Sequence, residues 1–229
     1  MKIILFDIDG TLMDSGGAGT KAVESAVCEV LGMPCSKIQK GSVSMAGKTD
    51  PQILKEMLNN LSIPYDRALL NDILGKYLSH LSVEISTNGK KLKPSVIEIL
   101  DWLSALENVH LGLLTGNMEE GARIKLSSLG IWERFGFGAY GSDNDDRNKL
   151  LPEALKRFKA LTGNEVTFRD CIVIGDTPRD VECSKPFGAY ALAVATGPYD
   201  MAALRKTEAD RVIKDLREAR EVLSPLLSA

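Results

Sequence analysis

The stretch that decides the fold is Lys2-Ile-Ile-Leu-Phe6 followed by Asp7-Ile-Asp-Gly-Thr-Leu12. A short, continuous apolar run of this kind is typical of a strand that is buried on both faces, as in a parallel sheet. Asp7 and Asp9 come directly after the run, in a loop that can bring their carboxylates together. Open α/β sheets bind ligands beyond the carboxyl ends of their strands. We therefore expect this loop to belong to a functional site.

Three further apolar runs have the same character, and segments with helical periodicity lie between the runs. The expected strands are residues 109–114, 171–174 and 190–194, and the expected helices are residues 95–106, 119–129, 150–161 and 180–187. Strands that alternate with helices predict the α/β class, with a doubly wound parallel sheet. The tail adds a strand-like segment at residues 211–213 and a final amphipathic helix.

A helical stretch from about residue 19 to residue 81 interrupts this alternation. Gly16, Gly17 and Gly19 precede it, and Asn88-Gly89 follows it. Turn-forming residues at both ends indicate a helical domain inserted into the α/β core, with these residues as hinges. We expect the core to comprise residues 1–15 and 92–229, and the inserted α-helical domain residues 16–91.

Composition limits the possible partners and the location of the protein. The 229 residues carry a formal net charge of -3, and 44% of them are hydrophobic. This balance excludes disorder and disfavours nucleic acid as a partner, because binding to phosphate backbones needs concentrated Lys and Arg. We expect no membrane association, since no apolar run approaches the length of a bilayer span. The absence of a signal peptide and four cysteines without CxxC spacing predict unpaired thiols in a reducing cytoplasm.

Acidic residues also follow the strand predicted at residues 171–174. Asp176 comes next after Gly175, and Asp180 lies near the start of the following helix. Carboxylates gathered at one edge of a sheet repel one another unless a cation neutralises them. Hard oxygen ligands of this kind select Mg²⁺. We therefore predict a Mg²⁺ site formed by Asp7, Asp9, Asp176 and Asp180.

The strand predicted at residues 109–114 ends differently, in Thr115-Gly116-Asn117. A hydroxyl group, an exposed amide and the start of a helix favour the binding of an anion there. Together with the acidic strand ends, this corner indicates phosphoryl transfer. One aspartate can attack phosphorus and form an acyl-phosphate, and a second carboxylate can protonate the leaving oxygen and later activate water.

The segments 7–14, 114–117 and 175–180 resemble the motifs of the haloacid dehalogenase-like hydrolase superfamily, in its phosphoglycolate phosphatase-like branch. The resemblance spans nearly the whole chain, and Gly47-Lys48-Thr49-Asp50 is similar to a segment of the same branch. It implies a Rossmann-like core with a helical cap. It also implies a hydrolase that acts on phosphoric monoester bonds of a small phosphorylated metabolite, with Mg²⁺ as cofactor.

The resemblance implies roles for the matching positions. Asp7 would be the nucleophile and a metal ligand, and Asp9 the general acid and base, with its backbone carbonyl on the metal. Thr115 would hold the transferring phosphoryl group. Asp176 would bind the metal directly, and Asp180 would bind it through water or hold one of its ligands. The residues expected to bind substrate or phosphate are Gly10, Thr11, Gly116, Asn117, Lys48 and Thr49, although the last two could equally only begin a helix near Asp50.

The third motif of the family is a basic residue, and here the chain departs from the usual pattern. Arg147 and Lys149 are both candidates for the catalytic cation, and Arg147 is favoured. Lys149 has Pro152 at the spacing of the family's Lys-Pro-x-Pro motif. Two alternatives to a phosphatase stay open: a phosphosugar mutase of the same fold, and a phosphate-binding or regulatory module without catalysis. The oligomeric state is not predicted.

Overall fold

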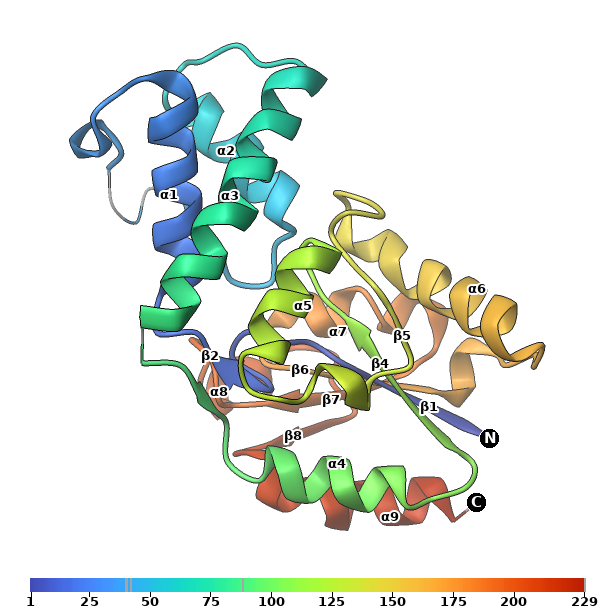
Figure 1. Cartoon of the computed structure of the whole chain (residues 1–229). Helices are drawn as coiled ribbons and strands as arrows, with labels where there is room; N and C mark the ends of the chain where they lie inside the picture. Colours follow the sequence, from blue (N-terminus) through green and yellow to red (C-terminus); the bar gives the residue numbers. More distant parts are fainter. Residues whose placement is uncertain (40, 42, 88, 229) are drawn as a thin grey trace.

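The computed structural model describes residues 1–39, 41, 43–87 and 89–228, and its centre is a six-stranded parallel sheet (Figure 1). The strand order is β5-β4-β1-β6-β7-β8. The strands are β1 (Lys2–Phe6), β4 (Val109–Leu114), β5 (Phe137–Ala139), β6 (Cys171–Gly175), β7 (Tyr190–Val194) and β8 (Arg211–Ile213). The first strand lies in the middle, between β4 and β6, so the ends of these three strands are neighbours.

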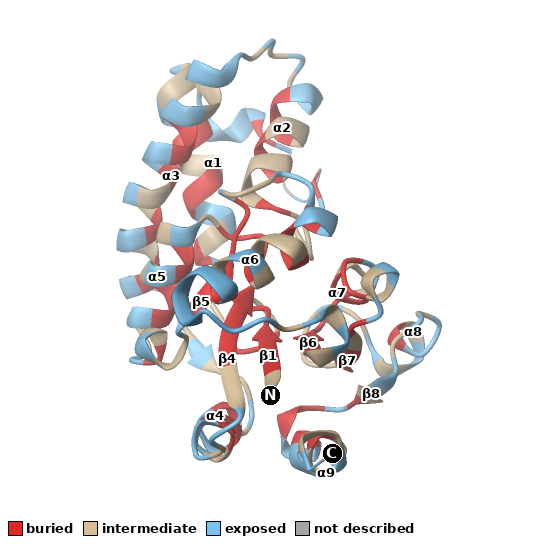
Figure 2. Ribbon diagram, turned by 90° about the vertical axis from the view of Figure 1, so that its right-hand side faces the viewer, coloured by how far each residue is buried: buried red, intermediate tan, exposed pale blue. Residues whose placement is uncertain are grey.

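Helices cover both faces of the sheet, as expected for a doubly wound α/β fold. The helices are α4 (Val96–Ser104), α5 (Glu119–Ser127), α6 (Leu150–Thr162), α7 (Pro178–Glu182), α8 (Met201–Leu204) and α9 (Ala219–Leu227). Ile4 and Phe6 of β1 belong to the core cluster that contains α4, α5 and α9, whereas Ile3 and Leu5 belong to the cluster that contains α6. Figure 2 accordingly shows β1 and β4 as buried over most of their length, with the start of β4 intermediate.

The predicted strands and most of the predicted helices of the core are confirmed, and the differences concern β5, α7 and the short helix α8, which is not predicted. Strand β5 is not predicted, because it has only three residues and one of them is Gly138. The helix expected at residues 180–187 is wrong in its extent: α7 is Pro178–Glu182, and a short 3₁₀ turn, Lys185–Phe187, follows it. Pro186 has no backbone N–H to continue an α-helix at this point.

A helical cap is inserted between two short strands, β2 (Met13–Asp14) and β3 (Lys91–Leu92). Its helices are α1 (Ala18–Leu31), α2 (Asp50–Asn60) and α3 (Arg67–Thr87), and Figure 1 shows them as a lobe beside the core. Strands β2 and β3 pair antiparallel where the chain leaves and re-enters the core. Of the predicted hinge residues, Gly16 and Gly17 have positive φ angles of 62° and 83°. Asn88 lies outside the described residues.

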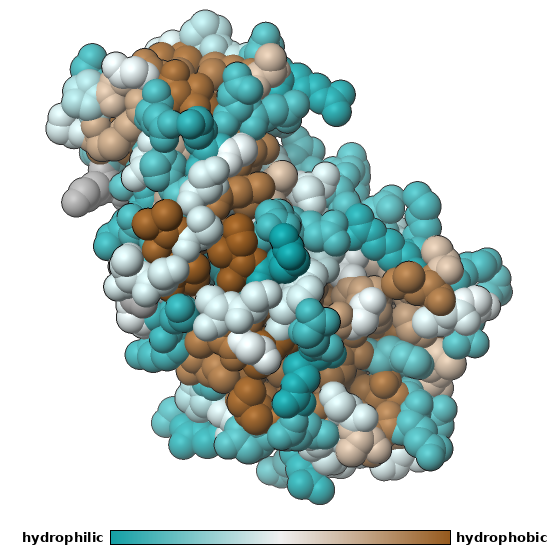
Figure 3. Space-filling view, viewed as in Figure 1, coloured by the Kyte–Doolittle hydropathy of each residue, from teal (hydrophilic) through white to brown (hydrophobic). Residues whose placement is uncertain are grey.

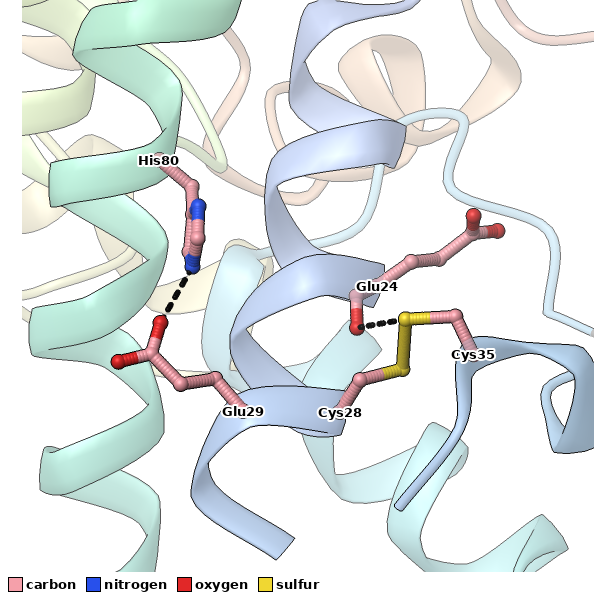
Figure 4. The surroundings of a disulfide bond; sticks show 5 residues. All are labelled: Glu24, Cys28, Glu29, Cys35 and His80. Carbon is pink, nitrogen blue, oxygen red and sulfur yellow. Dashed lines mark hydrogen bonds and ion pairs between the residues drawn. A yellow bond between two sulfur atoms is a disulfide. The ribbon is translucent and has the colours of Figure 1, made fainter. Parts of the chain in front are cut away.

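The expectation of four unpaired cysteines is wrong for two of them. Cys28 of α1 and Cys35 form a disulfide, with a Cα–Cα distance of 5.4 Å (Figure 4). The chain reverses after α1 at Gly32, where φ is 59°, and this turn brings Cys35 back beside the helix. Figure 4 also shows His80 of α3 bonded to Glu29 of α1, at 2.7 Å. Cys171 and Cys183 are free and buried.

The surface drawn in Figure 3 mixes hydrophilic residues with several separate apolar patches on both lobes. Within the described residues, no helix combines the length and the apolar character that crossing a bilayer requires.

Two glycines test the packing of core and cap. A Cβ at Gly112 of β4 would lie 2.8 Å from Phe137 Cζ and 2.9 Å from Leu5 Cδ2. A Cβ at Gly75 of α3 would meet no atom of the other described residues within 4 Å, apart from its chain neighbours and the backbone of its own helix. Gly112→Ala should lower the free energy of unfolding by about 1–3 kcal/mol through overpacking. Gly75→Ala should raise it by roughly 0.5–1 kcal/mol, because alanine favours the helix. Urea unfolding measures both, and equal midpoints for the two variants would contradict this packing.

Candidate active site

Three polar side chains meet at the carboxyl ends of adjacent strands. Asp7 follows β1, Thr115 follows β4 and Asp176 follows β6. The register pairs Phe6 with Leu113 on one side and with Ile174 on the other, so the three strands end at the same level. All three side chains are buried. The structure thus brings together the aspartates and the threonine that the sequence motifs single out.

Arg147 lies at the centre of this group and is only 4% exposed. Its Nη2 atom donates to Asp7 Oδ1 at 3.1 Å and to the Leu114 carbonyl at 3.3 Å, and it also pairs with Asp180. Nη1 donates to the Gly47 carbonyl of the cap at 3.1 Å. Lys149, the other candidate for the third motif, has a side chain that is 65% exposed and lies 4.0 Å from Asp146. The structure therefore places Arg147 in the site and Lys149 outside it.

Asp7, Asp176 and Asp180 form an acidic cluster in which each offers an oxygen within 4.8 Å of the others. Burial raises the pKa of Asp7, and the Arg147 guanidinium offsets this only in part. Burial, together with the charges of Asp7 and Asp180, also raises the pKa of Asp176. A cation in the cluster would relieve this repulsion.

The donor set fits a hard divalent cation. Asp176 Oδ2 is buried and has no hydrogen-bond partner among the described residues, although Oδ1 accepts a bond of 3.0 Å from Thr11. An unpaired carboxylate oxygen on a residue of a three-carboxylate cluster is suited to Mg²⁺, which prefers oxygen ligands. Asp180 is less free, because it binds Arg147 and accepts hydrogen bonds from the amide and hydroxyl of Thr177.

Asp9 is held by a lysine that the motifs did not reveal. Lys125 Nζ donates to Asp9 Oδ2 and to Asn117 Oδ1, both at 2.6 Å, and its side chain is only 4% exposed. Asn117 Nδ2 donates to the same Asp9 oxygen at 2.9 Å. Burial would raise the pKa of Asp9, but the Lys125 ammonium and these hydrogen bonds lower it below its ordinary value. The signal in the sequence was a lysine on the apolar stripe of α5, between Ala122 and Leu126.

The other predicted phosphate-binding residues divide into two groups. Gly10, Gly116 and Asn117 line the cavity in front of Asp7, together with Thr115. Thr11 lies behind Asp176 and is fully buried, so its hydroxyl positions that carboxylate. Gly10 has a φ of 87°, and a Cβ there would lie 2.2 Å from Asp176 Oδ2. Only glycine lets the loop turn this close to Asp176.

A segment of the cap, residues 47–50, docks directly on the core. The Asp50 amide donates to the Gly116 carbonyl and the Met118 amide donates to Asp50 Oδ2, both at 2.8 Å. A Cβ on Gly116 would lie 2.0 Å from the Lys48 carbonyl oxygen, so glycine is required at this contact. Thr49 caps α2, accepting from Gln52 and donating to the Asp145 carbonyl at 2.8 Å. Thr49 thus begins a helix and faces away from the cavity, whereas Lys48 lines it.

The cavity between cap and core has a volume of about 260 Å³. Its floor carries Asp7, Asp176 and Arg147, and Asp9 and Lys125 lie beside them. The cap supplies the opposite wall, which is mostly apolar: Val23, Met45, Ile53, Leu74 and Tyr77. A cap over the site can limit the access of water to a reacting carboxylate.

Fold and site together define an α/β enzyme with an acidic cluster and a buried cation beneath a helical cap. A statistical model of the haloacid dehalogenase-like hydrolase family matches residues 1–188. The chain therefore belongs to the haloacid dehalogenase-like hydrolase family, and it is an enzyme of the hydrolase class.

Sequence and structural similarities to individual proteins are consistent with this family. A phosphoglycolate phosphatase of Thiobacillus denitrificans is 22% identical over 219 residues, which cover 96% of this chain and 94% of the relative. A phosphoglycolate phosphatase of Pseudomonas syringae pv. syringae is 26% identical, over 95% of this chain and 78% of the relative. The crystal structure of a hydrolase from Pseudomonas syringae superimposes with a TM-score of 0.73 at 20% identity and covers 99% of both chains. This last similarity confirms the capped α/β fold.

The surroundings of Asp50 predict a pH-dependent stability. Burial raises its pKa to about 6, although Lys125 and the Met118 amide lower it in part. An ordinary aspartate has a pKa near 4, so the folded protein holds this proton more tightly than the unfolded chain does. The stability that results is present below about pH 4 and is lost as the pH rises through about 6.

Asp50→Asn removes this titration. The difference in unfolding free energy, variant minus wild type, should therefore rise by roughly 1–3 kcal/mol between pH 4 and pH 8. Urea unfolding at both pH values, without added metal, measures the rise. A difference between the two proteins that does not change with pH would contradict the raised pKa.

Proposed function

We propose that the chain is a Mg²⁺-dependent phosphatase that hydrolyses a small phosphate monoester through an aspartyl-phosphate intermediate. The observation that carries the proposal is the acidic cluster of Asp7, Asp176 and Asp180 beside Arg147, at the floor of the cavity between cap and core. The phosphoglycolate phosphatases among the relatives support the same class of reaction.

Asp7 is proposed as the nucleophile, because it borders the cavity and Arg147 contacts its Oδ1 atom at 3.1 Å. An attack of its other oxygen on phosphorus forms the acyl-phosphate and expels the alcohol. Arg147 orients Asp7 and stabilises charge on the transferring group, and Thr115 with the Gly116 amide provides hydrogen bonds to it. Asp7, Asp176 and the backbone carbonyl of Asp9 would hold Mg²⁺, which neutralises charge on the phosphate oxygens.

Asp9 is proposed to act in its protonated form as the acid that protonates the leaving alcohol and then, as a base, to activate water against the acyl-phosphate. Its lowered pKa favours the second of these roles. Its carboxylate is 39% exposed and borders the cavity, so it can reach a substrate. Lys125 and Asn117 fix its orientation through the same oxygen, Oδ2. Ser15 also hydrogen-bonds the Asp9 carboxylate, and the oxygen that Lys125 and Asn117 do not contact is proposed to exchange the proton.

The proposal predicts metal-dependent release of phosphate that depends on Asp7. The wild type should release inorganic phosphate from simple esters with Mg²⁺, and EDTA should abolish the release until Mg²⁺ is restored. Asp7→Asn should lower kcat by at least about 10⁴-fold, because the nucleophile is lost. Circular dichroism provides the control that this variant is folded. Release of phosphate by folded Asp7→Asn at the wild-type rate would refute the proposed nucleophile.

The third motif is tested by a matched pair of substitutions. Arg147→Ala should lower kcat/KM by at least about 100-fold, since a donor to the transferring phosphoryl group is lost. Lys149→Ala should change kcat/KM by less than about twofold, as expected for an exposed side chain away from the site. Steady-state assays of phosphate release compare the two variants. A larger loss of kcat/KM in Lys149→Ala would make Lys149, and not Arg147, the catalytic cation.

A further inference from the structure

The part of the cavity that would receive the leaving group is formed by the cap. Of the apolar residues there, Val23, Ile53 and Leu74 are each less than 10% exposed overall. Met45 and the ring of Tyr77 complete this wall. Apolar surface of this kind favours a leaving group that has apolar atoms of its own.

The cations that line the cavity are already paired with carboxylates of the protein. Within the described residues these cations are Lys48, Lys125 and Arg147. Lys48 is paired with Glu56 of α2, Lys125 with Asp9, and Arg147 with Asp7 and Asp180. A carboxylate on the leaving group would have to compete with these protein carboxylates for a cation that neutralises it.

Asp50 adds a negative charge to the same region. It lines the cavity and is held in place by the Met118 amide. Burying a second carboxylate near it without a free cation would be costly. A hydroxyl or amide group on the leaving group, in contrast, could donate to Asp50 without that cost.

We propose that the substrate's leaving group is an uncharged alcohol with an apolar portion, and that the cap disfavours an anionic one such as glycolate. The proposal rests on the phosphatase function above and narrows its substrate class. It assigns selectivity to Asp50 and to the Lys48–Glu56 pair, neither of which takes part in the proposed chemistry.

Three esters test the proposal: 3-methylbutyl phosphate, 2-phosphoglycolate and its amide, 2-phosphoglycolamide. The amide keeps the size of phosphoglycolate and removes only its carboxylate charge. The wild type should show a kcat/KM for 3-methylbutyl phosphate and for the amide at least about tenfold higher than that for phosphoglycolate, because a pocket rejects a group whose charge it leaves unpaired. A preference of the wild type for phosphoglycolate would overturn the proposal.

Two substitutions test the residues behind the selectivity. Glu56→Gln removes the partner of Lys48 and should raise kcat/KM for phosphoglycolate at least about fivefold, with less than about a twofold change for 3-methylbutyl phosphate. Asp50→Asn removes the negative charge and should shift the ratio in the same direction. Glu153→Gln, which removes the partner of Lys156 on α6, is the matched control and should leave the ratio unchanged. Unchanged ratios in both Glu56→Gln and Asp50→Asn would overturn the assignment.

Binding separates a failure of this proposal from a failure of the phosphatase function. Titration calorimetry with Mg²⁺ measures the affinity of the Asp7→Asn variant for the three esters without turnover. Tighter binding of the two esters with uncharged leaving groups supports the selectivity even if the wild type hydrolyses none of the three, an outcome that would refute the phosphatase function. Tighter binding of phosphoglycolate would overturn the selectivity while leaving a phosphatase function intact.

Discussion

The structure depends on one buried guanidinium. Arg147 contacts Asp7 after β1, the Leu114 carbonyl at the end of β4, Asp180 of α7 and Gly47 of the cap. Two carboxylates this deeply buried would repel each other without it, and removing one partner of such a group typically costs about 3–5 kcal/mol. A lysine could not replace it, since only the planar guanidinium presents donors to several acceptors in fixed directions.

The same side chain links the core to the cap. The segment at residues 47–50 reaches the core only because Gly116 leaves room for the Lys48 carbonyl and because Asp50 exchanges hydrogen bonds with the loop after β4. That loop also carries Thr115 and Asn117. A displacement of the cap would therefore disturb a contact of Arg147 and the loop proposed to bind phosphate at the same time. Closure of the cap and order in the site are coupled through these few bonds.

Much of this arrangement could be predicted from the sequence, because its signals are local. Buried parallel strands appear as continuous apolar runs, and the aspartates that follow them fall at the same sheet edge once the strands are adjacent. What could not be predicted depends on contacts between distant segments. Strand β5 is too short to stand out, and the pairing of Cys28 with Cys35 depends on the turn at Gly32. Lys125 lies eight residues after Asn117, and only the fold brings its ammonium group to Asp9.

The choice between Arg147 and Lys149 also depends on the fold and could not be made from sequence spacing alone. The two residues are only two positions apart, in a 3₁₀ turn where neighbouring side chains point in different directions. The spacing to Pro152 kept Lys149 as a candidate beside the favoured Arg147, and burial decides which residue can act on Asp7. The proposed selectivity for the leaving group likewise depends on a contact outside the motifs. The Gly47-Lys48-Thr49-Asp50 segment provides a lysine that lines the cavity, yet the charge of this lysine is paired with Glu56, six residues beyond the segment. Relatives that share the chemistry can therefore differ in substrate through residues that no catalytic motif contains.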